Sequence, residues 1–321
     1  HHEHQAEARD ALLVGRDVET RPGGVALVDH EQLLEERIRE AGRILVRHEQ
    51  LGVFVDAENV KCNGGYQLRY DVLRRFAARN GGTLLRLNTY LAFDQERARE
   101  DPDYAKRSYV YQQTVRDFGW KVIIKNVRRY TDEEGNVTTK ANADLDMAVD
   151  AMLQAEKLDQ VILVTGDGDF LQVVEALQNR GCRVELLGFR NVSKRLQRQV
   201  DDFFSGFLIP DLLPFSYEPR NDWGAPESCV RGICTKWFPE KGYGFLRFVR
   251  RLDGNLWITD PRDEGSPYGS AFCHVNELAE DVSQDDLLHR ETIVEFYLKE
   301  SEQKDDGLIA TNVRMVQPVG R

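Results

Sequence analysis

Residues 140–170 read KANADLDMAVDAMLQAEKLDQVILVTGDGDF and place aspartates on both sides of a short apolar run. The run, Val161–Val164, is β-branched and aliphatic throughout, which is typical of a strand buried on both faces of a parallel sheet. Because the run stops at Thr165, Asp167 and Asp169 follow its carboxyl end, each preceded by a glycine that permits a sharp turn. Ligands of open α/β sheets bind at this end of the strands, so the sequence predicts a site here.

The first half of the same stretch predicts a helix. Its apolar residues recur at helical spacing in one stripe: Leu145, Ala148, Val149, Met152 and Leu153. Asp144 precedes the stripe, while Asp146 and Asp150 lie four residues apart on its flank. Taken singly, these aspartates have ordinary interpretations: Asp144 and Asp169 as helix caps, and the other two as a solvated face.

A second apolar run, Leu51–Val55, also ends in a carboxylate, Asp56, with Asn59 three residues later. Parallel strands share one carboxyl edge, so we expect the aspartates of three segments to meet there. Oxygen-rich clusters suit Mg²⁺ or Mn²⁺, and a cation offsets the repulsion among the carboxylates. The sequence therefore predicts a metal site rather than a chance cluster.

Strand and helix patterns alternate from residue 51 to residue 209, which predicts an α/β domain with a mainly parallel sheet covered on both faces. Further strands are expected at 83–87, 121–124 and 183–187, and further helices near 66–79, 103–118, 170–180 and 193–203. The loop 128–140 enters the helix that bears Asp144. It is either a lip over the substrate or a surface hairpin without a role.

The motifs VFVDAEN, DLDMAVD and VTGDGDF, followed by GCRVELLGFRNVSKRL, resemble the NYN domain, a branch of the PIN-like nucleases. The resemblance implies RNA cleavage with Mg²⁺ or Mn²⁺ held by acidic residues. The catalytic residues it implies are Asp56, Asn59, Asp144, Asp167 and Asp169, of which the four aspartates would hold the metal. Asp146 and Asp150 would align these ligands. The chain departs from the family at 140–144, where a glycine is missing and the spacing is one residue longer.

Length and composition indicate more than one folded unit, since the chain has 321 residues of which 41% are hydrophobic. We expect an N-terminal extension at 1–48, the α/β domain at 49–209, a linker at 210–228 and a second domain at 229–321. The linker is inferred from its prolines and its lack of period, so a chain ending near Pro210 should stay folded. A helix near 29–45 carries a short apolar stripe that either packs on the α/β domain or pairs with a second copy in a homodimer.

Several classes of protein are disfavoured by the composition. No apolar run approaches a membrane span, and the polar start has no secretory signal. The 5 cysteines are odd in number and form no CxxC pair, which argues against a disulfide framework and a zinc site and predicts a cytoplasmic protein. A net charge of −11 predicts modest non-specific affinity for nucleic acid. Basic residues do cluster locally, among them Arg190 and Lys194.

Beyond residue 228 the chain changes to short strands rich in aromatics. Trp237, Tyr243 and Phe245 alternate so that they are expected on one face, beside Lys236 and Lys241. The sequence KWFPEKGYGFL, with AFCH at 271–274, resembles a cold-shock domain, an OB-type barrel that binds single-stranded nucleic acid. The resemblance implies that bases stack on Trp237, Tyr243, Phe245, Phe272 and His274. The connection 247–270 is much longer than in that family, and Val275 replaces a frequent aromatic.

Together these features predict a metal-dependent ribonuclease that cleaves single-stranded RNA captured by its C-terminal barrel. Two alternatives stay open. One is a non-catalytic RNA-binding regulator that keeps the nuclease fold as a scaffold. The other is a nuclease that acts on single-stranded DNA.

Overall fold

The computed structural model describes residues 49–131, 137–140, 143–215, 221–252, 255–301 and 307–316. Its first part is a six-stranded sheet in the order β3-β2-β1-β6-β7-β8, in which every neighbouring pair is parallel. The strands are β1 Gln50–Asp56, β2 Thr83–Phe93, β3 Lys121–Asn126, β6 Gln160–Val164, β7 Arg183–Gly188 and β8 Asp202–Ser205. The predicted α/β class is confirmed, whereas the expected helix near 29–45 lies outside the described residues.

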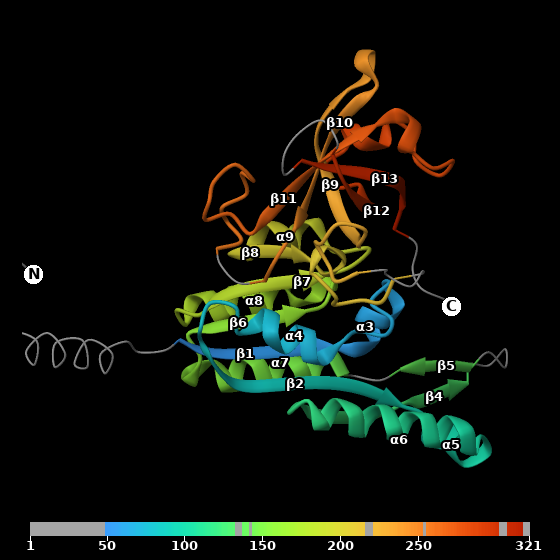
Figure 1. Ribbon diagram of the computed structural model, residues 1–321. Helices are drawn as coiled ribbons and strands as arrows, with labels where there is room; N and C mark the ends of the chain where they lie inside the picture. Colours follow the sequence, from blue (N-terminus) through green and yellow to red (C-terminus); the bar gives the residue numbers. More distant parts are fainter. Residues whose placement is uncertain are drawn as a thin grey trace, which may run out of the picture. The chain divides into compact units, whose positions relative to one another are not determined.

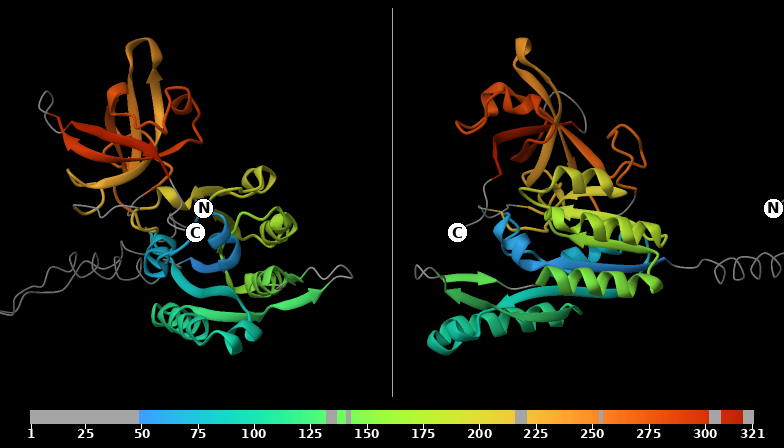
Figure 2. Two further views of the ribbon diagram at one scale, coloured as in Figure 1. Left: turned by 90° about the vertical axis from the view of Figure 1, so that its right-hand side faces the viewer. Right: turned by 180° about the vertical axis from the view of Figure 1, so that it is seen from behind.

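Helices cover both faces of this sheet (Figure 1; Figure 2). Both faces of the sheet are apolar and need cover. In β1, for example, Val53 and Val55 belong to one apolar core and Phe54 to the other. Leu73 and Val115 close the first core, while Met147 closes the second. The helices are α3 Ala57–Cys62, α4 Tyr70–Ala77, α5 Gln95–Glu100, α6 Pro102–Asp117, α7 Ala143–Gln154, α8 Leu171–Asn179 and α9 Lys194–Gln199.

Two of the helix predictions are wrong in detail. In α7 the structure buries Ala143, Met147 and Ala151, which leaves the predicted stripe largely outside: Leu145, Val149 and Leu153 are 60%, 41% and 70% exposed. The buried face follows the four-residue spacing of Ala143, Met147 and Ala151, and Ala148 and Met152 of the predicted stripe pack only partly against the same core. The helix expected near 193–203 ends at Gln199, and the chain then continues as β8. The loop 128–140 contains a hairpin, β4 Arg128–Thr131 with β5 Val137–Lys140.

The second part is a closed five-stranded barrel of mixed direction, in the order β10-β11-β13-β12-β9. The pair β11 and β13 is parallel, and the remaining neighbours are antiparallel. The strands are β9 Cys229–Phe238, β10 Tyr243–Val249, β11 Tyr268–His274, β12 Ile293–Glu300 and β13 Leu308–Met315. The long insertion joins the Val249 and Tyr268 ends of β10 and β11, so it lies at the opposite end of that hairpin from Tyr243 and His274.

The segment expected to be a linker is packed at its start. Leu212 and Leu213 are 0% and 4% exposed and belong to the core cluster that contains α4. Three barrel residues, Val249, Leu256 and Val316, belong to that same cluster. In the barrel, the buried Arg231 guanidinium donates to the Pro214 carbonyl at 2.8 Å and pairs with Glu295 at 3.0 Å. Apolar packing therefore continues from the α/β domain through residues 212–213 into the barrel.

That a chain ending near Pro210 stays folded is still a prediction, and the shared core argues against it. Leu212→Ala should lower the free energy of unfolding by about 2–5 kcal/mol, the range for a buried leucine, and melt both domains in one transition. Leu288→Ala, at a position 53% exposed, is the matched control and should change it by roughly 0.5 kcal/mol or less. Thermal denaturation of both variants measures this. Two separate transitions, with a Leu212→Ala variant as stable as the wild type, would contradict the shared core.

Candidate active site

Asp56 stands at the carboxyl end of β1 and caps α3. Its side chain accepts a hydrogen bond from the Asn59 backbone N–H at 3.0 Å and another from the Thr165 hydroxyl at 3.3 Å. The carboxylate is almost fully enclosed, at 3% exposure. The sequence places it there because β1 ends where α3 begins, and an aspartate at that junction satisfies an unpaired helix N–H.

The turn after β6 carries the second acidic residue of the site, Asp167, whose charge acts on Asp56. The Asn59 side-chain oxygen accepts from the Gly166 backbone N–H at 2.8 Å, which ties this turn to α3. A Cβ on Gly166 would lie 3.3 Å from the Val192 backbone, so the turn packs tightly against that segment. The Asp167 N–H donates to Thr165 Oγ1 at 3.2 Å, and Asp167 in turn accepts from the Asp169 N–H at 3.0 Å.

A cavity of about 370 Å³ opens between these segments. Asp56 and Asn59 line it from the β1–α3 junction, Asp144 from the first turn of α7, and Asp167 from the turn after β6. Asp169 is exposed and is not among the described lining residues, although its charge reaches Asp144. The structure thus brings together four of the five residues that the sequence analysis selected.

The pKa values of two carboxylates in this cavity, Asp56 and Asp144, are raised. Burial first, and then the charges of Asp144 and Asp167, raise the pKa of Asp56 to about 6 against the two hydrogen bonds that lower it. Burial and the charge of Asp167 also raise the pKa of Asp144. Both shifts mean that the negative charges are unfavourable together in the absence of a cation.

The donor chemistry of the cavity suits a hard divalent cation, since it offers carboxylate and amide oxygens. Within the described residues, however, no three carboxylate, imidazole or thiol groups already lie together as an assembled metal site. Exposed side chains such as Asp144 would have to rotate to complete the coordination of an ion.

The two aspartates expected to align the ligands have other partners. Asp146 pairs with Lys125 of β3, and Asp150 accepts a hydrogen bond from the Tyr90 hydroxyl at 2.7 Å. Neither is among the described residues that line the cavity. Thr165 is the residue that the sequence analysis missed, because it was read only as the end of a strand, although it bonds to both Asp56 and Asp167.

Comparison with known proteins supports the assignment made from these acidic motifs. The NYN domain matches residues 50–212, about half of the chain. The chain belongs to the NYN domain family. A relative, the low amplitude and bright protein LabA of Synechococcus elongatus, is 25% identical over 162 residues, which covers 49% of this chain and 82% of LabA.

One solved structure also matches part of the chain. It is a protein of unknown function from Vibrio parahaemolyticus, 26% identical, with a TM-score of 0.41. The match covers 52% of this chain and 97% of that chain. Among the helices that the structure describes, none is long and apolar enough to span a bilayer.

C-terminal to the NYN domain, the barrel presents a cluster of aromatic side chains on the outer face of β10 and β11. Ring centroids lie 5.5 Å apart for Tyr243 and Phe272, 6.0 Å for Phe245 and Phe272, and 5.2 Å for Phe238 and Tyr243. Lys236 and Lys241 place their ammonium groups 4.7 Å and 5.8 Å from the Phe238 ring centroid. We call these four rings the aromatic face.

Trp237 is not part of this face, contrary to the prediction. It is 7% exposed, belongs to the barrel core and donates its indole N–H to Gln284 at 3.1 Å. The reason is a bulge in β9 opposite Phe245 and Leu246, which adds one residue, so that Thr235 and Lys236 both point outward and Trp237 turns inward. Phe238 takes the outer position instead.

The other residues predicted to bind nucleic acid lie in two different parts of the structure. His274 pairs with Tyr243 across the ladder and is half-buried, and its Nδ1 accepts from the Asn276 N–H at 3.3 Å. Arg190 and Lys194 of the NYN domain instead contact the C-terminal part of the chain. The Arg190 guanidinium donates to the Val316 carbonyl at 2.7 Å, and Lys194 pairs with Glu291 at 2.5 Å.

The raised pKa of Asp56 predicts that its ionised carboxylate lowers the free energy of unfolding, to an extent that depends on pH. The folded pKa lies above that of the unfolded chain, so the penalty is complete above about pH 6 and disappears as the pH falls toward 4. In EDTA at pH 8, Asp56→Asn should therefore stabilise the protein by about 1–3 kcal/mol, and the gain should shrink by pH 4. Thermal melts across this range, with the exposed Asp222→Asn as control, measure it. Destabilisation by Asp56→Asn at pH 8 would show that its charge is already compensated.

Proposed function

We propose that this chain is a metal-dependent ribonuclease that cleaves single-stranded RNA at the NYN carboxylate cavity and captures it on the aromatic face. The observation that carries the proposal is the convergence of Asp56, Asn59, Asp144 and Asp167, from three segments, on one cavity at the carboxyl edge of the sheet. A cluster of this kind, built at a cost in stability, is typical of sites that act on a charged substrate with a cation. The NYN family, a ribonuclease-type family, supports the same chemistry.

Each residue has a role that follows from its position. Asp56, Asp144 and Asp167 would hold Mg²⁺ or Mn²⁺, with Asp169 available after rotation from the neighbouring turn. Bound there, the cation would activate a water molecule and stabilise charge on the scissile phosphate. Asn59 acts as a positioning residue, because its side chain fixes the turn that carries Asp167 relative to Asp56.

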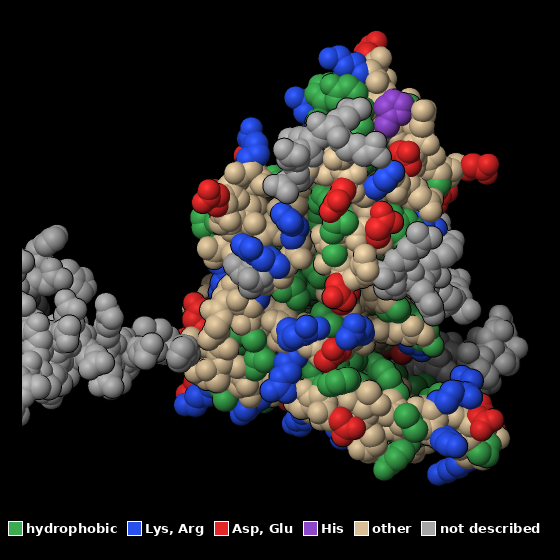
Figure 3. Space-filling view, viewed as in Figure 1, with side chains coloured by type: hydrophobic (Ala, Val, Ile, Leu, Met, Phe, Trp, Pro, Cys, Tyr) green, Lys and Arg blue, Asp and Glu red, His purple; other side chains and the backbone are tan. Residues whose placement is uncertain are grey.

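The barrel supports RNA capture through its topology and its surface. Its strand order, closed by a parallel β11–β13 pair, is that expected of an OB-type barrel, and its aromatic face is the stacking platform that such domains use for single strands. Figure 3 shows Lys and Arg intermixed with Asp and Glu on the displayed face rather than in one basic patch. Because the net charge of the chain is −11, stacking is expected to supply more of the affinity than charge.

Cleavage tests the proposal directly. Asp167→Asn should abolish Mg²⁺- or Mn²⁺-dependent cutting of a labelled single-stranded RNA while RNA binding in EDTA is retained, because it removes a ligand and leaves the barrel unchanged. Asp222→Asn should cut at the wild-type rate. Denaturing gels with RNA and with DNA of the same sequence give the readout. Binding without cutting by the wild-type protein would favour a non-catalytic regulator, and cutting of DNA alone would change the substrate class.

The aromatic face generates a separate prediction about affinity. Replacing Tyr243 and Phe245 together by alanine should weaken RNA binding by roughly 2–6 kcal/mol, at about 1–3 kcal/mol for each stacked base. The dependence of log K on log salt should be shallow, since each neutralised phosphate of a single strand contributes about −0.7 to the slope. Fluorescence anisotropy in EDTA at several salt concentrations measures both. A steep slope with a silent double variant would mean that basic residues capture the RNA.

A further inference from the structure

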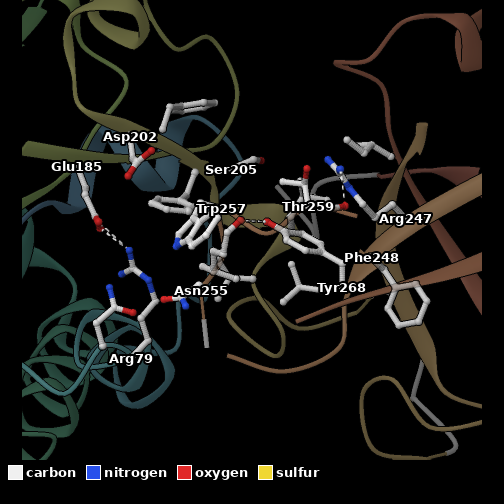
Figure 4. Close-up of a pocket in the computed structure, with 18 of the residues that line it drawn as sticks. Arg79, Glu185, Asp202, Ser205, Arg247, Phe248, Asn255, Trp257, Thr259 and Tyr268 are labelled. Atoms are coloured by element: carbon white, nitrogen blue, oxygen red, sulfur yellow. Dashed lines mark hydrogen bonds and ion pairs between the residues drawn. The ribbon is translucent and has the colours of Figure 1, made fainter. Parts of the chain in front are cut away.

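A second cavity, of about 490 Å³, lies where the NYN domain contacts the barrel. Its volume is within the range of sites for small ligands. Residues of both domains line it, among them Arg79, Arg183 and Glu185 on the NYN side and Arg247, Trp257 and Tyr268 on the barrel side (Figure 4). Neither the carboxylate cavity nor the aromatic face includes these residues.

Trp257 is the unusual member of this lining. It is 76% exposed, whereas Trp120 and Trp237 are 3% and 7% exposed. Its loop is nevertheless fixed: Leu256 is buried in the core shared with the NYN domain, and its carbonyl accepts from the Tyr268 hydroxyl at 2.9 Å. Ser266 Oγ also donates to the Ile258 carbonyl at 2.7 Å. The fixed loop therefore presents an exposed indole at the cavity, where a flat ligand can stack on it.

Arg247, which lines the cavity, lies on the same strand as Tyr243 and Phe245 of the aromatic face. Along β10 the outward side chains are Tyr243, Phe245 and Arg247, because the residues between them point into the barrel. Phe245 pairs across the ladder with Phe272, and two residues further on Arg247 pairs with Ser270. A strand of RNA stacked on the aromatic face and running along β10 would therefore reach Arg247 and the cavity.

Charge in the cavity favours an anion near Arg247. On the NYN side the cations are paired, Arg79 with Glu185 at 2.7 Å and Arg183 with Asp202. The Arg247 guanidinium instead lies 5.0 Å from the Tyr268 ring centroid and donates to the Thr259 carbonyl at 3.0 Å. No carboxylate of the described residues forms an ion pair with Arg247, so its charge is available to a phosphate.

We propose that this cavity binds one nucleotide of the RNA strand held by the aromatic face, with the base stacked on Trp257 and its phosphate on Arg247. The inference rests on the proposed function, since it extends the RNA path from the barrel to the NYN domain. It assigns residues 255–259 of the long insertion a role in substrate binding. The cavity is chemically suited to a nucleotide in a chain or to a free one, and the experiment separates these sources.

The test measures binding of a fluorescein-labelled oligoadenylate dodecamer in EDTA by anisotropy. Trp257→Ala should weaken binding by roughly 5-fold to 150-fold, the effect of losing one stacked base, while Trp257→Phe keeps most of the affinity. Tyr109→Ala, which removes a side chain 63% exposed on α6, is the matched control and should bind as the wild type does. Because Trp257 is exposed, melting temperatures of all variants should stay unchanged.

A second series separates the possible failures. Phe245→Ala and Trp257→Ala combined should show the sum of their single effects, since they would hold different bases. If Trp257→Ala binds RNA normally while Phe245→Ala does not, the inference is overturned and the proposed function stands. Quenching of tryptophan fluorescence by adenosine monophosphate, without any effect of Trp257→Ala on RNA binding, would show a free-nucleotide site and also overturn it. If the wild type binds no RNA, the proposed function itself fails.

Discussion

Repulsion among carboxylates at one edge of the sheet is the constraint around which the NYN domain is arranged. Asp56 is enclosed, and its neighbours Asp144 and Asp167 raise its pKa further. Such a group persists only when the surrounding structure holds it in place. Here the buried strands β1 and β6 supply that support, and hydrogen-bonded turns at their ends fix the backbone at Asp56 and Asp167.

The apolar core shared between the domains has a consequence for how capture and cutting would be coupled. A flexible linker would make the barrel a tethered module, with a local concentration set by linker length. Leu212, Leu213 and Leu256 instead pack in one cluster with the NYN domain. The buried Arg231 guanidinium of the barrel adds to this, because it donates to the Pro214 carbonyl just after Leu212 and Leu213. Under the proposed function, the distance from the captured base to the cut phosphate would therefore be fixed by packing.

Sequence reasoning succeeded where one local rule decides the outcome. The continuous apolar runs of β1 and β6 predict buried parallel strands, and their carboxyl ends share an edge, which is why Asp56, Asp144 and Asp167 were selected together. It failed where long-range packing decides. The bulge that turns Trp237 inward depends on pairing between β9 and β10. The alternation of residues within β9 alone does not predict it. In α7, Ala143, Met147 and Ala151 are buried in place of most of the predicted apolar stripe. The prolines at 210–228 predict a linker, yet Leu212 and Leu213 belong to the core.

Net charge and site chemistry together explain why the proposed function needs a binding surface apart from the catalytic cavity. An RNA phosphate that approaches Asp56, Asp144 and Asp167 without a cation meets repulsion, and a chain of net charge −11 offers little general attraction. Affinity must then come from contacts that do not depend on the total charge. Under the proposed function, aromatic rings would provide it, with local cations such as Lys236, Lys241 and Arg247 orienting the RNA backbone. Because stacking accepts any base, the cut position would be set by the fixed spacing between the rings and the carboxylates rather than by base sequence.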